Sequence, residues 1–171
     1  MRSQLPNLCI TGTPGCGKTS LASELCRHSP GLTYVDLGKE IKERSLFSEW
    51  DDEMNASILD EDKVIDFLQQ LVAEHKQGGL IVDFHSVGFF PSELFAGAVV
   101  LRTDTDKLWD RLSARGYTEA KVKENVEAEI FQTSLEEAVE AFGEDNVISK
   151  ESNTPEDAQK NLEFLIKFLN N

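Results

Sequence analysis

The stretch GTPGCGKTS, residues 12–20, carries residue types suited to phosphate chemistry. Gly12 is followed by four residues and then by Gly17, Lys18 and Thr19. This is the complete G-x-x-x-x-G-K-[ST] spacing of a phosphate-binding loop. Glycines let the backbone turn tightly, so that successive N–H groups can surround a phosphate chain. The spacing therefore predicts a nucleoside triphosphate site, ahead of the alternative of an ordinary glycine-rich turn with a solvated lysine.

The flanks of this loop agree with that prediction. Residues 8–10 form a short apolar run typical of a buried strand, and the residues after the loop have apolar side chains at helical spacing. In the resulting strand, loop and helix, Lys18 would reach the β- and γ-phosphates, and the hydroxyl of Thr19 would coordinate Mg²⁺.

A second acidic motif, LIVDFH, places Asp83 at the carboxyl end of an apolar strand. Open parallel sheets put their ligand groups at this end. Such an aspartate can hold the Mg²⁺ bound by Thr19, directly or through water; the alternative is an aspartate that caps the next turn. The chain contains no N-K-x-D guanine-reading element, and no D-x-x-G follows a strand. The prediction is therefore ATP rather than GTP.

Phosphoryl transfer depends on positioning and on cations near the transferred group. The stretch DKLWDRLSARGY has Arg111 and Arg115 four residues apart, on the helix face opposite Leu108 and Leu112. Gly116 is suited to end that helix. By itself the pair could be a solvated helix face. Together with the phosphate loop, it predicts two guanidinium groups close to the phosphates.

The elements that must position these groups alternate between short apolar runs and helical patterns. That alternation predicts an α/β fold with a parallel sheet. The expected strands are residues 8–11, 33–37, 80–83, 98–102 and 147–149. The expected helices include residues 60–76, one from about 119 to 142 that ends at Gly143, and a last one with Thr154 as N-cap and Pro155 as first residue.

Length and composition indicate one soluble globular domain. The chain has 171 residues, of which 40% are hydrophobic and 28% charged. Neither a leader peptide nor an apolar run of membrane-spanning length is expected, and so the prediction is an intracellular protein without a membrane partner. Cys9, Cys16 and Cys26 show no C-x-x-C pairing. We expect them to be reduced thiols, without a disulfide or a zinc site.

The net charge of −14 argues against general nucleic-acid binding, because such binding needs a broad basic face. Any positive potential must be local to the phosphate site. The acidic clusters EWDDE and LDED have two interpretations, a solvated surface or a docking face for a basic protein.

The motifs TGTPGCGKT, ILDEDKVID, IVDFH with FFP, VVLRTDT and ARGYTEAKVKENVEAEIFQ together resemble the adenylate kinase isoenzyme 6 family, also described as coilin-interacting nuclear ATPase proteins. The resemblance spans nearly the whole chain. It implies a P-loop NTPase fold of the adenylate kinase type, with a five-stranded parallel sheet and flanking helices. It also implies a single domain over residues 1–171, with a nucleoside-monophosphate-binding arm near residues 36–59 and a short lid near residues 114–124.

The functions implied by this resemblance belong to two classes. The first is an enzyme that transfers phosphate from ATP to AMP or other nucleoside monophosphates, with additional ATPase activity. The second is an assembly factor in small-ribosomal-subunit maturation, whose ATP hydrolysis switches its binding of a small-subunit ribosomal protein. The family resemblance further implies residence in the nucleus as well as the cytoplasm.

The resemblance also assigns residues. It implies that Arg115 is the lid arginine on ATP and that Asp83 and His85 form the family's D-x-H motif. The acceptor phosphate would be bound by Asp36, Lys42 and Arg44. The ATP phosphate cradle would consist of Gly15, Gly17, Lys18, Thr19 and Ser20.

Three positions depart from the family pattern. Ser86 replaces the usual glycine after D-x-H, and Thr154 stands near the adenine where a lysine is frequent. Lys42 aligns with an acceptor arginine, although Arg44 follows two residues later. Lysine cannot form the bidentate fork that arginine makes with phosphate. We therefore expect weak binding of the monophosphate.

Overall fold

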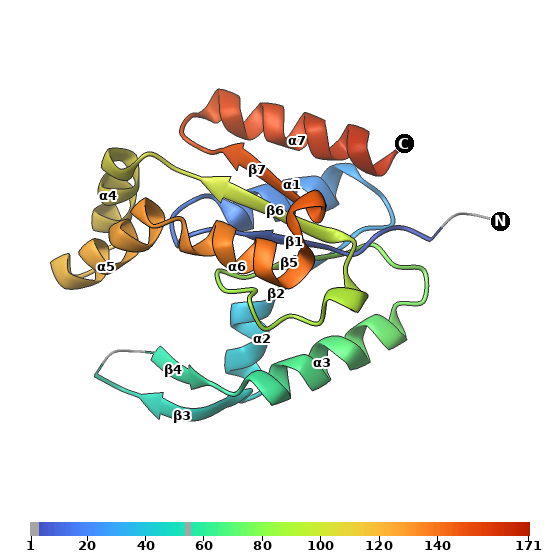
Figure 1. Cartoon of the computed structure of the whole chain (residues 1–171), viewed down its shortest axis with the longest axis horizontal. Helices are drawn as coiled ribbons and strands as arrows, with labels where there is room; N and C mark the ends of the chain where they lie inside the picture. Colours follow the sequence, from blue (N-terminus) through green and yellow to red (C-terminus); the bar gives the residue numbers. More distant parts are fainter. Residues whose placement is uncertain (1–3, 54–55) are drawn as a thin grey trace.

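A computed structural model describes residues 4–53 and 56–171 (Figure 1). Five parallel strands form the central sheet in the order β2-β5-β1-β6-β7, which confirms the predicted parallel α/β sheet. All five strands match the predicted ranges within two residues at each end. The bounds are β1 Leu8–Thr11, β2 Thr33–Asp36, β5 Leu80–Asp83, β6 Gly97–Arg102 and β7 Val147–Glu151.

Helices cover both faces of the sheet, because successive side chains of a strand point to opposite sides. In β1, Leu8 and Ile10 pack against α1 (Lys18–His28) and α7 (Pro155–Leu169). Cys9 lies on the other face, in the core lined by the remaining helices of the sheet, α2 (Leu37–Glu43), α3 (Glu61–Glu74) and α6 (Thr133–Phe142). The fold thus has three layers, with β1 at its centre.

Helix caps fix several element boundaries. The Thr154 side chain accepts a hydrogen bond from the backbone N–H of Asp157, and the Asp157 side chain accepts one from the backbone N–H of Thr154. This capping box encloses Pro155, the first residue of α7, so that α7 begins as predicted. Asp60 caps α3, which ends at Glu74, two residues earlier than expected. Leu37 starts α2 instead of ending β2, because the Asp36 side chain caps that helix.

The single helix predicted over residues 119–142 is wrong. The structure has α5 (Glu119–Ile130) and α6, separated at Gln132, whose φ of 56° lies in the left-handed region. The break has a packing reason. Val122 of α5 is buried against α4 (Thr105–Ala114), whereas Ala138 and Phe142 of α6 are buried in the core of the sheet. One straight helix could not bury both sets.

Besides α2, two strands and two 3-10 helices were not predicted. An antiparallel hairpin of β3 (Phe47–Asp51) and β4 (Ala56–Leu59) extends away from the central sheet (Figure 1). It follows α2, so residues 36–59, the range predicted for the arm, contain a helix and a hairpin; residues 54–55 lie outside the described part. The 3-10 helices η1 (Ser92–Leu94) and η2 (Glu144–Asn146) precede β6 and β7.

Two other expectations can be compared with the described residues. Cys9, Cys16 and Cys26 are free cysteines in the structure, and Cys9 and Cys16 are buried. In the part of the chain that the structure describes, no helix combines the length and the apolar character needed to cross a bilayer.

Gly97, the first residue of β6, tests the tight packing between η2 and the sheet. A Cβ added there would lie 2.1 Å from the main-chain oxygen of Asn146. We expect Gly97→Ala to lower the free energy of unfolding by about 1–3 kcal/mol, because the backbone must move apart. Gly38 of α2 is the control, since a Cβ there meets only the Asp36 carboxyl at 3.5 Å. The free energy of unfolding is measured with urea. Equal values for Gly97→Ala and Gly38→Ala would contradict this packing.

Candidate active site

The loop between β1 and α1 lies at the centre of the carboxyl edge of the sheet, where parallel sheets bind ligands. Gly12, Gly15 and Gly17 have φ values of 147°, 93° and 88°, a region that L side chains rarely adopt. At Gly12 the neighbours also exclude a side chain, because a Cβ would lie 2.8 Å from the Leu101 carbonyl oxygen. The glycines therefore allow a tight loop pressed against β6.

The ammonium group of Lys18 is held by this loop itself. Its Nζ donates hydrogen bonds to the carbonyl oxygens of Gly12, at 2.9 Å, and Thr13, at 3.3 Å. Burial is the main cause that lowers the pKa of Lys18, while the charge of Asp83 acts in the opposite direction. The cation thus lies across the loop, held by neutral acceptors that an anionic phosphate oxygen could replace.

Thr19, Asp83 and Tyr34 meet beside the loop. The hydroxyl groups of Thr19 and Tyr34 both donate to Oδ2 of Asp83, at 2.7 and 2.9 Å. Asp83 is 5% exposed. Burial and the Asp83 charge raise the pKa of Tyr34, so that its phenol stays protonated and can donate. The predicted pair of Thr19 and Asp83 is thus brought together, and Tyr34 is an additional member that the sequence analysis missed.

The oxygens of Thr19 and Asp83 fit a magnesium ion. Mg²⁺ prefers oxygen ligands and in phosphate-transfer sites is bound by one or two carboxylates, with phosphates and water as its other ligands. Among the described residues no group of three or more His, Cys, Asp or Glu side chains could hold a metal. The donor set therefore suits an ion that arrives with a phosphate ligand better than a metal held by protein alone.

His85 follows Asp83 at the edge of the loop after β5. Its ring lies 4.5 Å from that of Phe84, between ring centroids. The His85 side chain is exposed, and its pKa is lowered, first by partial desolvation and then by the Lys18 ammonium. A lowered pKa leaves the imidazole neutral at neutral pH, with a ring nitrogen able to accept a proton.

Ser86, where the family pattern has glycine, makes a contact that glycine cannot make. Its hydroxyl donates to Oε2 of Glu137 on α6, at 3.0 Å. The side chain thus links the His85 loop to α6.

The predicted acceptor residues lie on or beside α2. Asp36 accepts from the backbone N–H of Lys39 as the helix cap. Arg44 pairs with Glu40, and its guanidinium carbon lies 4.8 Å from the ring centroid of Phe67 on α3. Lys42 is exposed in the last turn of α2. In this conformation, Asp36 and Arg44 therefore contact residues of α2 and α3.

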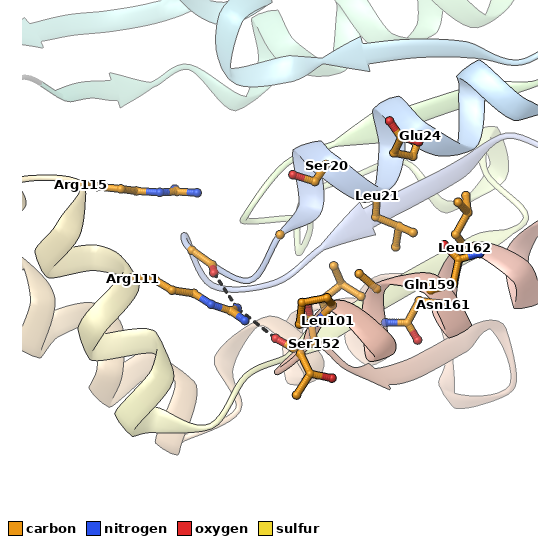
Figure 2. Close-up of a pocket in the computed structure, with 15 residues that line it drawn as sticks. Ser20, Leu21, Glu24, Leu101, Arg111, Arg115, Ser152, Gln159, Asn161 and Leu162 are labelled. Carbon is orange, nitrogen blue, oxygen red and sulfur yellow. Dashed lines mark hydrogen bonds between the residues drawn. The ribbon is translucent and has the colours of Figure 1, made fainter.

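A pocket of about 470 Å³ opens beside the phosphate loop (Figure 2). Its walls come from the loop, α1, the end of β6, α4, the segment that joins β7 to α7, and α7 itself. One part is apolar, with Leu21, Leu101 and Leu162, and the amide groups of Gln159 and Asn161 lie beside it. The predicted site residues on its wall are Gly15, Gly17, Ser20, Arg111, Arg115 and Thr154.

The two arginines of α4 differ in their contacts. Nη1 of Arg111 donates to the carbonyl oxygens of Gly15, at 3.2 Å, and Ser152, at 3.0 Å. Nη2 donates to the Asn153 carbonyl, at 3.0 Å. Arg111 thus connects α4, the loop and the end of β7. Arg115 is exposed and extends toward the loop in Figure 2. Arg115 is therefore the more available of the two for a ligand.

Comparisons with known proteins agree with this geometry. The family model described as "AAA domain" matches residues 8–132. The chain is 43% identical to an adenylate kinase isoenzyme 6 homolog of Caenorhabditis elegans, over 92% of this chain and 86% of that protein. It is 41% identical to a homolog of the same name from Schizosaccharomyces pombe, over 98% of this chain and 94% of that one.

Solved structures show the same fold at low sequence identity. Shikimate kinase from Bacteroides thetaiotaomicron aligns with a TM-score of 0.63 and 17% identity, over 98% of this chain and 99% of that chain. A gluconokinase from Sinorhizobium meliloti 1021 aligns with a TM-score of 0.55 and 16% identity, over 99% and 98%. The fold is that of the adenylate-kinase-like P-loop NTPases, as predicted.

Lys18 is the loop cation that the site geometry singles out. We expect Lys18→Ala to lower ATP turnover by about 100-fold or more, since transition-state charge loses its nearest stabilising group. Lys63→Ala, at an exposed position of α3, is the matched control and should keep wild-type turnover. Turnover is measured as ADP formed per minute. A folded Lys18→Ala protein with near-normal turnover would place the reacting phosphate elsewhere.

Proposed function

The chain belongs to the adenylate kinase isoenzyme 6 family, and from this premise we propose that it transfers the γ-phosphate of ATP to AMP or another nucleoside monophosphate and also hydrolyses ATP. One observation carries the proposal. The loop with Lys18, the pair of Thr19 and Asp83, and a pocket with an apolar wall lie together at one edge of the sheet. A nucleotide has a matching division into a phosphate chain and an apolar, planar base.

In the proposed complex, the adenine lies between the apolar wall and the amides of Gln159 and Asn161. The triphosphate extends to the loop, whose N–H groups and the start of α1 favour negative charge. Lys18 leaves the carbonyls of Gly12 and Thr13 for the phosphate oxygens. Arg115 turns onto the phosphates from α4. Arg111 keeps the loop in place through the Gly15 carbonyl.

We propose that Thr19 and Asp83 hold Mg²⁺ when ATP binds, which supplies positive charge to the β- and γ-phosphates. The Thr19 hydroxyl and the Asp83 carboxylate, now joined by a hydrogen bond, would be the side chains that hold the ion. Tyr34 remains on Asp83 and keeps its carboxylate oriented.

The phosphoryl acceptor decides between the two reactions. For transfer to AMP, the arm residues Asp36, Lys42 and Arg44 hold the acceptor phosphate in line. Arg44 must then leave Glu40 and Phe67, and Lys42 offers only a point charge. Both features favour weak acceptor binding. For hydrolysis, the neutral imidazole of His85 orients a water molecule.

His85 separates the two reactions experimentally. We expect His85→Ala to reduce phosphate release from ATP about 10-fold or more, while ADP formation with saturating AMP falls less, because a bound acceptor phosphate is already in line. ADP and inorganic phosphate are measured with and without AMP. Wild-type protein that forms neither product would refute the proposed function. Equal losses in the two assays would refute only the separate role of His85.

A second function, that of an assembly factor, is favoured by the charge of the chain. A net charge of −14 gives no long-range attraction to nucleotides, which are themselves anionic, but it attracts a basic protein. The carboxylates of Asp51, Asp52 and Glu53 are exposed at the β3–β4 hairpin. We propose this hairpin as the docking face for a basic small-subunit ribosomal protein. Residence in the nucleus and cytoplasm belongs to the same proposal.

The three carboxylate charges of the β3–β4 hairpin can be removed without changing any residue of the phosphate loop. We expect the triple change Asp51→Asn, Asp52→Asn and Glu53→Gln to slow association with purified basic proteins of the small ribosomal subunit. The wild-type rate should fall steeply with salt, because charges are screened beyond about 8 Å at physiological ionic strength. Association rates are measured by surface plasmon resonance over a salt series, and ATP binding by calorimetry should stay unchanged.

The control removes the same charge elsewhere. Glu144, Asp145 and Glu156 are exposed near the two ends of β7 and are changed to the corresponding amides. If both triple variants slow association equally, only the overall charge matters, and the hairpin is not the docking face. A flat salt response in the wild type would remove the electrostatic argument altogether.

A further inference from the structure

Glu129 is a buried carboxylate that the proposed reaction does not use. Among the described residues, Asp83 and Glu129 are the buried acidic side chains, and Glu129 is 4% exposed. It lies in the last turn of α5, far along the sequence from the phosphate loop. A buried charge is unfavourable unless it is paired and hydrogen-bonded. Its partners therefore indicate what holds it there.

Both carboxylate oxygens of Glu129 are engaged by other elements. Oε2 accepts from the hydroxyl of Thr13 in the phosphate loop, at 2.6 Å. Oε1 accepts from Nε of Arg102, at 2.7 Å, and from the backbone N–H of Thr103, at 3.2 Å. Arg102 also donates to the main-chain oxygen of Glu129, at 3.2 Å. One side chain thus joins α5 to the loop and to the carboxyl end of β6.

The loop atoms bound by Glu129 are close to the proposed chemistry. The carbonyl of Thr13, whose hydroxyl binds Glu129, accepts from Lys18 and also from the backbone N–H of Cys16, at 3.1 Å. On the other side of this turn, the hydroxyl of Ser152 donates to the Cys16 carbonyl, at 2.6 Å. The turn from Thr13 to Cys16 is therefore held at its first residue by Glu129 and at its last by Ser152.

The helix that carries the arginines is attached to the same loop. A Cβ on Gly15 would lie 3.0 Å from Leu108 and 3.1 Å from Leu112, so α4 rests directly on the loop. Leu108 and Leu112 also pack with Val122 of α5 in a separate apolar cluster. Figure 2 shows Arg111 reaching from α4 to the loop. The pair α4 and α5 thus contacts the loop from α4, through Leu108, Leu112 and Arg111, and from α5, through Glu129.

We propose that Glu129 is a positioning residue that fixes the α4–α5 pair on the phosphate loop and so places Arg115 for phosphoryl transfer. The inference rests on the proposed function, in which Arg115 acts on the phosphates. Without Glu129, the helix pair would be attached to the loop only through α4, where Leu108, Leu112 and Arg111 all lie at Gly15, and it could pivot about that contact. The second attachment, near the opposite end of α5, prevents that rotation. Arg115 at the end of α4 then keeps a fixed distance from the loop.

Glu129→Gln tests this role with almost no change of size. An amide has one acceptor oxygen and an NH₂ group, so it cannot accept from both Thr13 and Arg102. If the amide oxygen keeps Arg102, the NH₂ group faces the Thr13 hydroxyl, which must then accept instead of donate, and the charge on Arg102 is no longer compensated. We expect kcat to fall about 10- to 100-fold, since small misplacements of a catalytic group have effects of this size. The KM for ATP should change less than about threefold, because the loop amides remain.

Two further variants keep the test decisive. Glu127→Gln changes an exposed carboxylate on the same helix and should leave kcat unchanged. Thr13→Val removes only the hydroxyl that binds Glu129 and leaves the pair with Arg102 in place. Thr13→Val should therefore lower kcat, as Glu129→Gln does. If Glu129→Gln does not fold, Thr13→Val carries the test. Circular dichroism at the assay temperature establishes that each variant is folded.

A double-mutant cycle with Arg115→Ala distinguishes positioning from a general structural role. If Glu129 acts by placing Arg115, the double variant should have nearly the same kcat as Arg115→Ala alone. Losses that multiply, or an unchanged kcat in folded Glu129→Gln and Thr13→Val, would overturn the inference and leave the proposed function intact. A wild-type chain that converts no ATP would overturn the proposed function, and the inference with it.

Discussion

The close approach of the loop after β1 to the end of β6 is the constraint on which the site depends. Gly12 lies so near the Leu101 carbonyl that no side chain fits there. Because β1 is the central strand, residues from the strands on either side of it can contact the loop. Asp83 approaches from β5, and Ser152 from the segment after β7. A shift of β1 relative to its neighbours would separate these groups.

The charge of the site is opposite to that of the chain. The net charge is −14, yet Lys18, Arg111 and Arg115 gather at one edge of the sheet. In this structure Lys18 and Arg111 bind main-chain carbonyls, which are dipoles rather than anions. In the described part of the chain, these hydrogen bonds hold the two charges in place without a direct ion pair to a carboxylate. Such an arrangement favours an anionic ligand locally, whereas the acidic surface favours a basic partner at longer range.

Local sequence patterns predicted what depends on local structure. The loop, the pairing of Thr19 with Asp83 and the cap at Thr154 each follow from residue types at short spacing or at strand ends. The break at Gln132 could not be predicted this way, because it results from α5 and α6 packing on different partners. The role of Glu129 could not be predicted either, because in the sequence it is one of several acidic residues of a charged helix. Only the fold brings it into contact with Thr13.

The central claim is that the Lys18 ammonium, now on the carbonyls of Gly12 and Thr13, exchanges these acceptors for phosphate oxygens. A crystal structure with Mg²⁺ and a non-hydrolysable ATP analogue measures this directly. The account predicts Nζ of Lys18 within hydrogen-bond distance of the β- and γ-phosphates, with the Thr19 hydroxyl on the metal. An analogue bound away from the loop, with Lys18 still on the two carbonyls, would contradict it.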